Sequence, residues 1–96
     1  MNNNDTIDLI TYSGAINSGG YEQICDVFKH RKSAKALLVL ATPGGDPHAG
    51  FRIARALQHT FGAFDALVPR YCKSAGTLVL LGASTLYMDD INSVTL

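Results

Sequence analysis

The sequence has 96 residues, of which 47% are hydrophobic and 17% are charged, a balance typical of one small globular domain and unlike that of a disordered chain. Eight basic residues balance eight acidic ones, which argues against a partner that is nucleic acid or an anionic membrane surface. The two cysteines have neither a CxxC spacing nor a metal-ligand spacing, so we expect two reduced core thiols and no metal site.

The first half of the chain predicts a polar tail followed by a strand, a helix and a second strand. Residues 1–6 are polar and are expected to form a disordered tail. Residues 7–12 alternate apolar and polar side chains, as in a strand. Tyr21 begins a series of apolar residues with helical spacing, which predicts an amphipathic helix over residues 20–31. Residues 36–41 are continuously apolar, which is typical of a strand buried on both faces of a parallel sheet.

A glycine-rich break separates this strand from a second helix. Residues 42–45 read TPGG, which ends the strand. Asp46 is suited to cap a helix, and Pro47 is suited to the first helical position. The helix that follows has one apolar face between residues 49 and 61. The opposite face carries the polar side chains Arg52, Arg55 and His59.

The last third of the chain predicts a third strand over residues 66–71, a buried helix over residues 74–82 and a short fourth strand over residues 85–88. Strands that alternate with helices through short connections indicate an α/β fold with a mostly parallel sheet. In such sheets ligands bind beyond the carboxyl ends of the strands. Residues 13–14, 42–47 and 72–76 follow successive strands, so we expect these loops to meet at that edge.

The loop after the third strand places a hydroxyl where a strand turns into a helix. Ser74 is expected at this bend, and the N–H of Ala75 is free to bind an oxyanion at the helix N-terminus. Gly76 would allow a close approach of the backbone. The alternative is that Ser74 only caps the buried helix.

The glycine pair after the second strand strengthens the catalytic interpretation. Gly44 and Gly45 let the backbone turn and present N–H groups without obstruction. The N–H groups of Gly45 and Ala75 would together form an oxyanion hole for a tetrahedral intermediate. The alternative is a turn followed by the Asp46 cap.

A serine nucleophile also needs a base, and the chain offers two weak candidates. His48 lies beside the glycine pair, and Lys73 is adjacent to Ser74. Neighbouring side chains at a bend usually point apart, so Lys73 is better explained as a solvent-facing cation. Asp46 is already explained as a helix cap, so no acid is identified that would orient a histidine base.

The segments ATPGGDPHAGFRIARAL and VPRYCKSAGTLVLLGAS resemble the Clp/crotonase superfamily, and within it the group of serine dehydrogenase proteinase and signal peptide peptidase A. The first segment is similar to the Pro-Gly-Gly loop and following helix of that group. The second is similar to its nucleophile elbow, in which serine, a small residue and glycine precede an apolar helix. The resemblance extends over nearly the whole chain.

This resemblance implies that Ser74 is the nucleophile of a serine peptidase that acts on a peptide or protein. It implies an oxyanion hole from the backbone of Gly45 and Ala75, support from Gly44 and Gly76, no cofactor, and a homo-oligomer. In this group the general base comes later in the chain, as a histidine or a lysine. Residues 7–96 would then be the N-terminal part of a peptidase domain.

Two other functions fit the same residues. One is a crotonase-like enzyme, in which paired N–H groups stabilise the enolate of an acyl-CoA thioester without a serine nucleophile. The other is a truncated, non-catalytic fragment that acts only by association, which the absence of a convincing base favours. The sequence shows neither a signal peptide nor a transmembrane segment, so we expect a cytoplasmic protein.

Overall fold

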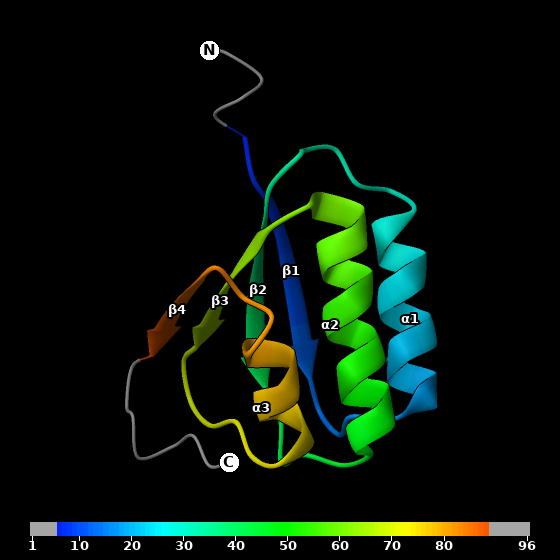
Figure 1. Cartoon of the computed structure of the whole chain (residues 1–96), viewed down its shortest axis with the longest axis vertical. Coiled ribbons are helices and arrows are strands. Elements are labelled where there is room, and N and C mark those ends of the chain that lie inside the picture. The colour runs from blue at the N-terminus through cyan, green and yellow to red at the C-terminus, as the bar shows by residue number, and fades with distance from the viewer. Residues whose placement is uncertain (1–5, 89–96) are drawn as a thin grey trace.

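Four parallel strands and three helices alternate along residues 6–88, the part of the chain that the computed structural model describes (Figure 1). Their bounds are β1 (Asp8–Ser13), α1 (Ser18–Phe28), β2 (Ala36–Ala41), α2 (Pro47–Phe61), β3 (Phe64–Val68), α3 (Ala75–Leu80) and β4 (Thr85–Met88). The strands lie in the order β1-β2-β3-β4, and each neighbouring pair is parallel. The predicted α/β fold is therefore confirmed. Of the predicted tail, only Thr6 falls within the described residues.

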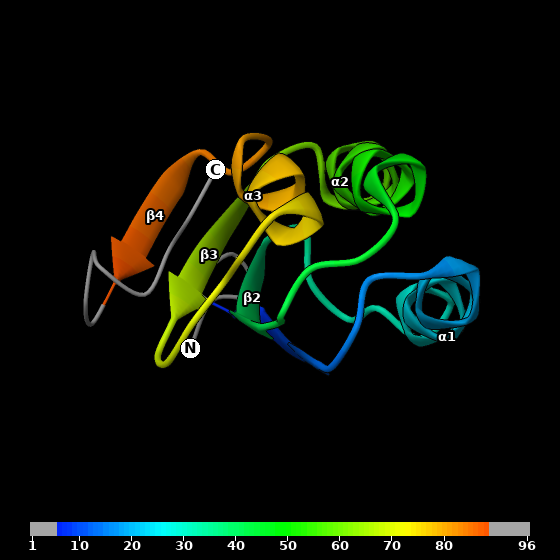
Figure 2. The same ribbon diagram turned by 90° about the horizontal axis from the view of Figure 1, so that it is seen from below.

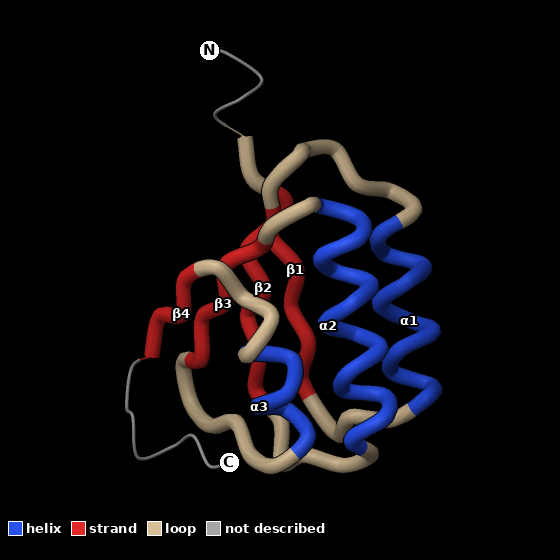
Figure 3. The backbone as a smooth tube through the Cα atoms, in the orientation of Figure 1, coloured by secondary structure: helices blue, strands red, loops and turns tan. Residues whose placement is uncertain are grey.

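All three helices cover the same face of the sheet, as Figures 2 and 3 show. Ile10, Leu38 and Ala66 lie side by side in neighbouring strands on this face, and each is at most 4% exposed. On the opposite face Leu9 is 67% exposed and Leu37 is half-buried.

The prediction that residues 36–41 are buried on both faces was therefore wrong. Each crossover moves to the next strand in the same direction, so every helix falls on one side of the sheet. A continuous apolar run cannot reveal this arrangement, because it specifies only that both faces of the strand are apolar.

Both long helices begin where a side chain caps the first turn. The side chain of Asn17 accepts a hydrogen bond from the Gly20 N–H at 2.7 Å, which starts α1 before the predicted residue 20. Asp46 caps α2 by accepting from the His48 N–H at 3.0 Å, and Pro47 is the first helical residue. The predicted start of α2 is confirmed.

Edge-to-face packing of two phenylalanines joins α1 to α2. The ring centroids of Phe28 and Phe61 are 5.7 Å apart at an interplanar angle of 90°.

Among residues 6–88 no helix is both long enough and apolar enough to cross a membrane.

Candidate active site

Three loops meet at the carboxyl ends of β1, β2 and β3, and backbone hydrogen bonds join them. The glycine loop (residues 42–47) pairs with the loop after β1 in a parallel bridge between Ile16 and Gly45. The Ile16 N–H donates to the Gly44 carbonyl at 2.8 Å, and the Asp46 N–H donates to the Ile16 carbonyl at 2.8 Å. The glycine loop therefore has a fixed position against the first loop.

Thr42 joins the glycine loop to the elbow, which we define as residues 72–76. Its N–H donates to the Tyr71 carbonyl at 3.2 Å, and its carbonyl accepts from the Lys73 N–H at 3.1 Å. Its hydroxyl oxygen accepts from the Gly44 N–H at 3.1 Å, and Thr42 is completely buried. One residue thus holds both loops, a role that sequence reasoning missed.

Ser74 lies at the elbow in a strained backbone conformation. Its φ of 48° and ψ of −116° make it the one non-glycine residue with positive φ in the described part of the chain. Such a conformation costs about 1–3 kcal/mol and persists only where its surroundings impose it. The Thr77 hydroxyl donates to the Ser74 carbonyl at 2.6 Å, and the Thr77 N–H donates to the same oxygen at 3.0 Å.

The side chain of Ser74 makes no capping hydrogen bond, although the residue stands at the N-cap position of α3. The residue is also exposed. The alternative interpretation of Ser74 as a simple helix cap therefore does not describe this geometry.

The glycine loop packs directly against the elbow. Gly44 is buried with φ +103°, and a Cβ atom there would lie 2.7 Å from the Ser74 Cβ and 2.9 Å from the Lys73 carbonyl oxygen. Gly45 has φ +143°, and a Cβ atom there would collide with the Ile16 carbonyl. Both positions require glycine, for the backbone angle and for the space.

Two backbone donors at this edge have no hydrogen-bond partner among residues 6–88. The N–H groups of Gly45 and Ala75 donate no hydrogen bond within residues 6–88. One belongs to the glycine loop that packs against Ser74, and the other directly follows Ser74 at the start of α3. The edge therefore presents free N–H groups beside an exposed hydroxyl.

Gly76 fills the narrow space behind the elbow. A Cβ atom there would collide with the Thr42 methyl group and would lie 2.6 Å from the Cys72 sulfur. Cys72 is completely buried and forms an isolated bridge with Thr42.

The predicted third strand extended through residue 71, whereas β3 ends at Val68.

Neither candidate base is hydrogen-bonded to Ser74. His48 and Lys73 are both exposed, and neither side chain has a hydrogen-bond partner within residues 6–88. The described residues also contain no cluster of three or more histidine, cysteine, aspartate or glutamate side chains that would hold a metal ion.

Replacing Thr42 by valine is expected to destabilise the glycine loop, because the buried Gly44 N–H loses its acceptor. An unsatisfied buried donor costs about 1–3 kcal/mol of stability. Chemical denaturation should show this loss for Thr42→Val. Thr42→Ser keeps the hydroxyl and should retain the Gly44 hydrogen bond. Equal loss of stability in the two variants would contradict the assigned role of the hydroxyl.

The fold defined by this sheet is the Clp/crotonase-type protease fold, and comparison with solved structures supports this assignment. A mutant of the membrane-bound stomatin-specific protease in complex with a substrate peptide superimposes with a TM-score of 0.71 at 25% identity, over 85% of this chain and 40% of that chain. The catalytic domain of the ClpP protease from Plasmodium falciparum gives a TM-score of 0.63 at 10% identity, over 82% of this chain and 53% of that one.

Two further proteins are similar to this chain. A membrane protease from Pyrococcus horikoshii, specific for a stomatin homolog, gives a TM-score of 0.67 at 25% identity, over 85% of this chain and 44% of that chain. An uncharacterized protein of Methanocaldococcus jannaschii is 40% identical over 53 residues, which are 55% of this chain and 18% of that protein. The chain thus spans less than half of the stomatin-specific proteases that it resembles. No protein-family profile matches it.

Proposed function

We propose that this chain is the nucleophile-bearing, N-terminal part of a serine peptidase domain, with Ser74 as the nucleophile. The observation that carries the proposal is the state of Ser74 where the glycine loop packs against it. This residue is exposed, has a strained backbone conformation, and makes no capping hydrogen bond with its side chain. A strained serine at a strand-to-helix turn is the arrangement in which hydrolases expose a nucleophilic hydroxyl. The protease fold of the solved relatives supports the same function.

In this proposal the free N–H groups of Gly45 and Ala75 form the oxyanion hole. Both are unengaged in the described part of the chain, so they are available to the negative charge that develops on the substrate carbonyl oxygen. Removal of one such donor typically slows catalysis by about 10²–10³-fold. Gly44 and Gly76 support the hole by allowing the glycine loop and the elbow to approach each other.

The general base is proposed to come from outside residues 6–88. Within these residues neither His48 nor Lys73 hydrogen-bonds the serine hydroxyl, and an unactivated serine is a weak nucleophile. The base takes the proton of Ser74 as Oγ attacks the carbonyl carbon. It then gives that proton to the leaving amine as the C–N bond breaks, and water hydrolyses the ester that remains.

The proposed substrate is an extended peptide. The support is the complex of one structural relative with a substrate peptide. We further propose a homo-oligomer, because the sheet face that no helix covers carries exposed apolar side chains such as Leu9 and Tyr87.

Mass spectrometry of an acyl-enzyme would test the proposed function. The full-length protein is mixed with an activated peptide ester and quenched in acid within seconds. The proposal predicts a mass gain equal to the acyl group, located on the peptide that contains Ser74. A crotonase-like enzyme would instead bind acyl-CoA without any covalent mass gain, and this result would contradict the peptidase proposal.

A further inference from the structure

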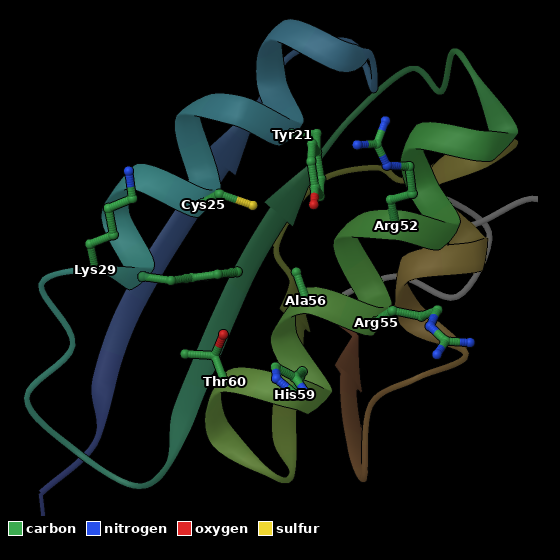
Figure 4. A pocket seen from close by; sticks show the side chains of 9 residues that line it. Tyr21, Cys25, Lys29, Arg52, Arg55, Ala56, His59 and Thr60 are labelled. Atoms are coloured by element: carbon green, nitrogen blue, oxygen red, sulfur yellow. The ribbon is translucent and has the colours of Figure 1, made fainter.

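A groove between α1 and α2, with a volume of about 570 Å³, lies apart from the catalytic loops (Figure 4). Tyr21 and Phe28 of α1 and Ala56 of α2 give it an apolar lining. None of the residues that line it belongs to the glycine loop or the elbow. Its volume falls within the range of about 300–1,000 Å³ that is usual for binding sites.

The groove carries positive charge that the described part of the chain does not neutralise. Arg52 and Arg55 of α2 line it, and no aspartate or glutamate of the described part of the chain does. The Arg52 guanidinium carbon lies 4.2 Å from the centroid of the Tyr21 ring, and no carboxylate between residues 6 and 88 pairs with it. Within residues 6–88 the one salt bridge joins Lys29, which also lines the groove, to Asp26 at 3.2 Å.

The spacing of these groups follows the helix. Arg52, Arg55 and His59 occupy positions i, i+3 and i+7 of α2, so they form one row. The row is roughly 10 Å long, at a rise of about 1.5 Å per residue. A small anion can contact only one or two of these three side chains at once. A second helix with carboxylates along one edge can contact all three.

We propose that this groove binds an acidic amphipathic helix of a partner protein. Carboxylates of the partner helix pair with Arg52, Arg55 and His59, and its apolar face packs on the half-buried Tyr21 and Ala56. Helices that bind in grooves use anchors with the same i, i+3 and i+7 spacing. This binding site is independent of Ser74 and of the proposed peptidase function.

The reactivity of Cys25 can report whether the groove is occupied. Its side chain is partly exposed and lines the groove. Cys72 is completely buried, and burial raises the pKa of its thiol to about 11. In the native protein an alkylating reagent should therefore modify Cys25 selectively, and a bound helix should slow this reaction.

The test uses a labelled peptide of about 16 residues, long enough to form helix in water, with glutamates along one edge and leucines on the adjoining face. Binding is measured by fluorescence anisotropy, and occupancy by protection of Cys25 from N-ethylmaleimide. We expect saturable binding that weakens with salt, and protection of Cys25 at saturation. The double variant Arg52→Gln with Arg55→Gln should bind roughly tenfold more weakly, because two rim ion pairs are lost.

The matched control variant removes two positive charges outside the groove. Lys32 and Lys35 are exposed and do not line the groove, so Lys32→Gln with Lys35→Gln should leave the peptide affinity unchanged. Equal weakening in the two double variants would overturn the proposal, as would equal binding of a peptide with glutamine in place of glutamate. Protection by a single-stranded oligonucleotide but not by the peptide would also overturn it. So would self-association in sedimentation that the arginine variants abolish, since the occupant would then be a second copy.

Discussion

Replacement of Ser74 by alanine is expected to abolish covalent labelling of the full-length protein by a fluorophosphonate, while the protein stays folded. The reagent requires a nucleophilic hydroxyl, and Ser74 is exposed at the elbow without a capping hydrogen bond. Loss of the hydroxyl removes the nucleophile completely, so labelling should fall to the level of the denatured protein. Because the Ser74 side chain makes no capping hydrogen bond in the part of the chain that the structure describes, the thermal midpoint should change little.

Ser84 provides the control. It is exposed and follows α3, outside the glycine loop and the elbow, and its N–H donates to the Phe64 carbonyl. Alanine at this position keeps that backbone bond, so Ser84→Ala should be labelled at the wild-type rate. Labelling that survives Ser74→Ala, or that Ser84→Ala removes, would contradict Ser74 as the nucleophile.

Gly44→Ala is expected to displace the glycine loop from the elbow, with a loss of both labelling and stability. A methyl group there would lie 2.7 Å from the Ser74 Cβ and 2.9 Å from the Lys73 carbonyl oxygen. These are backbone or nearly backbone atoms, so a loop must move. Overpacking of this kind costs about 1–3 kcal/mol, and a displaced oxyanion donor slows the reaction by about 10²–10³-fold.

The variant Gly14→Ala is a control that separates the cost of the contact between residue 44 and the elbow from the cost of alanine at positive φ. Gly14 has φ +118°, close to the +103° of Gly44, but a methyl group there would meet no atom within 4 Å. The two variants share the cost of placing alanine at positive φ, so their difference reports the contact with the elbow. Equal effects of the two substitutions on labelling and on chemical denaturation would show that the contact between Gly44 and Ser74 has no role.

Features that depend on local chemistry could be predicted from the sequence. Asp46 and Pro47 form a helix start within a few residues, so the beginning of α2 was predicted correctly. The order of strands and helices was also predicted, because apolar periodicity is a local property. The meeting of the glycine loop and the elbow followed from one topological rule for parallel sheets.

Features that depend on contacts between distant segments could not be predicted. The role of Thr42 rests on hydrogen bonds to Tyr71 and Lys73, about thirty residues away along the chain. Ser74 was open to interpretation as a helix cap, and only the folded elbow shows that within residues 6–88 its side chain makes no capping hydrogen bond. The single covered face of the sheet follows from the strand order, which an apolar run does not encode.

A crystal structure of the full-length protein after reaction with a fluorophosphonate tests the central claim most directly. The account predicts a covalent bond from the Ser74 Oγ to phosphorus. It also predicts one phosphonyl oxygen about 2.7–3.1 Å from the backbone nitrogens of both Gly45 and Ala75, the range expected for oxyanion donors. A phosphonyl oxygen turned toward solvent, or an adduct on another residue, would contradict the account.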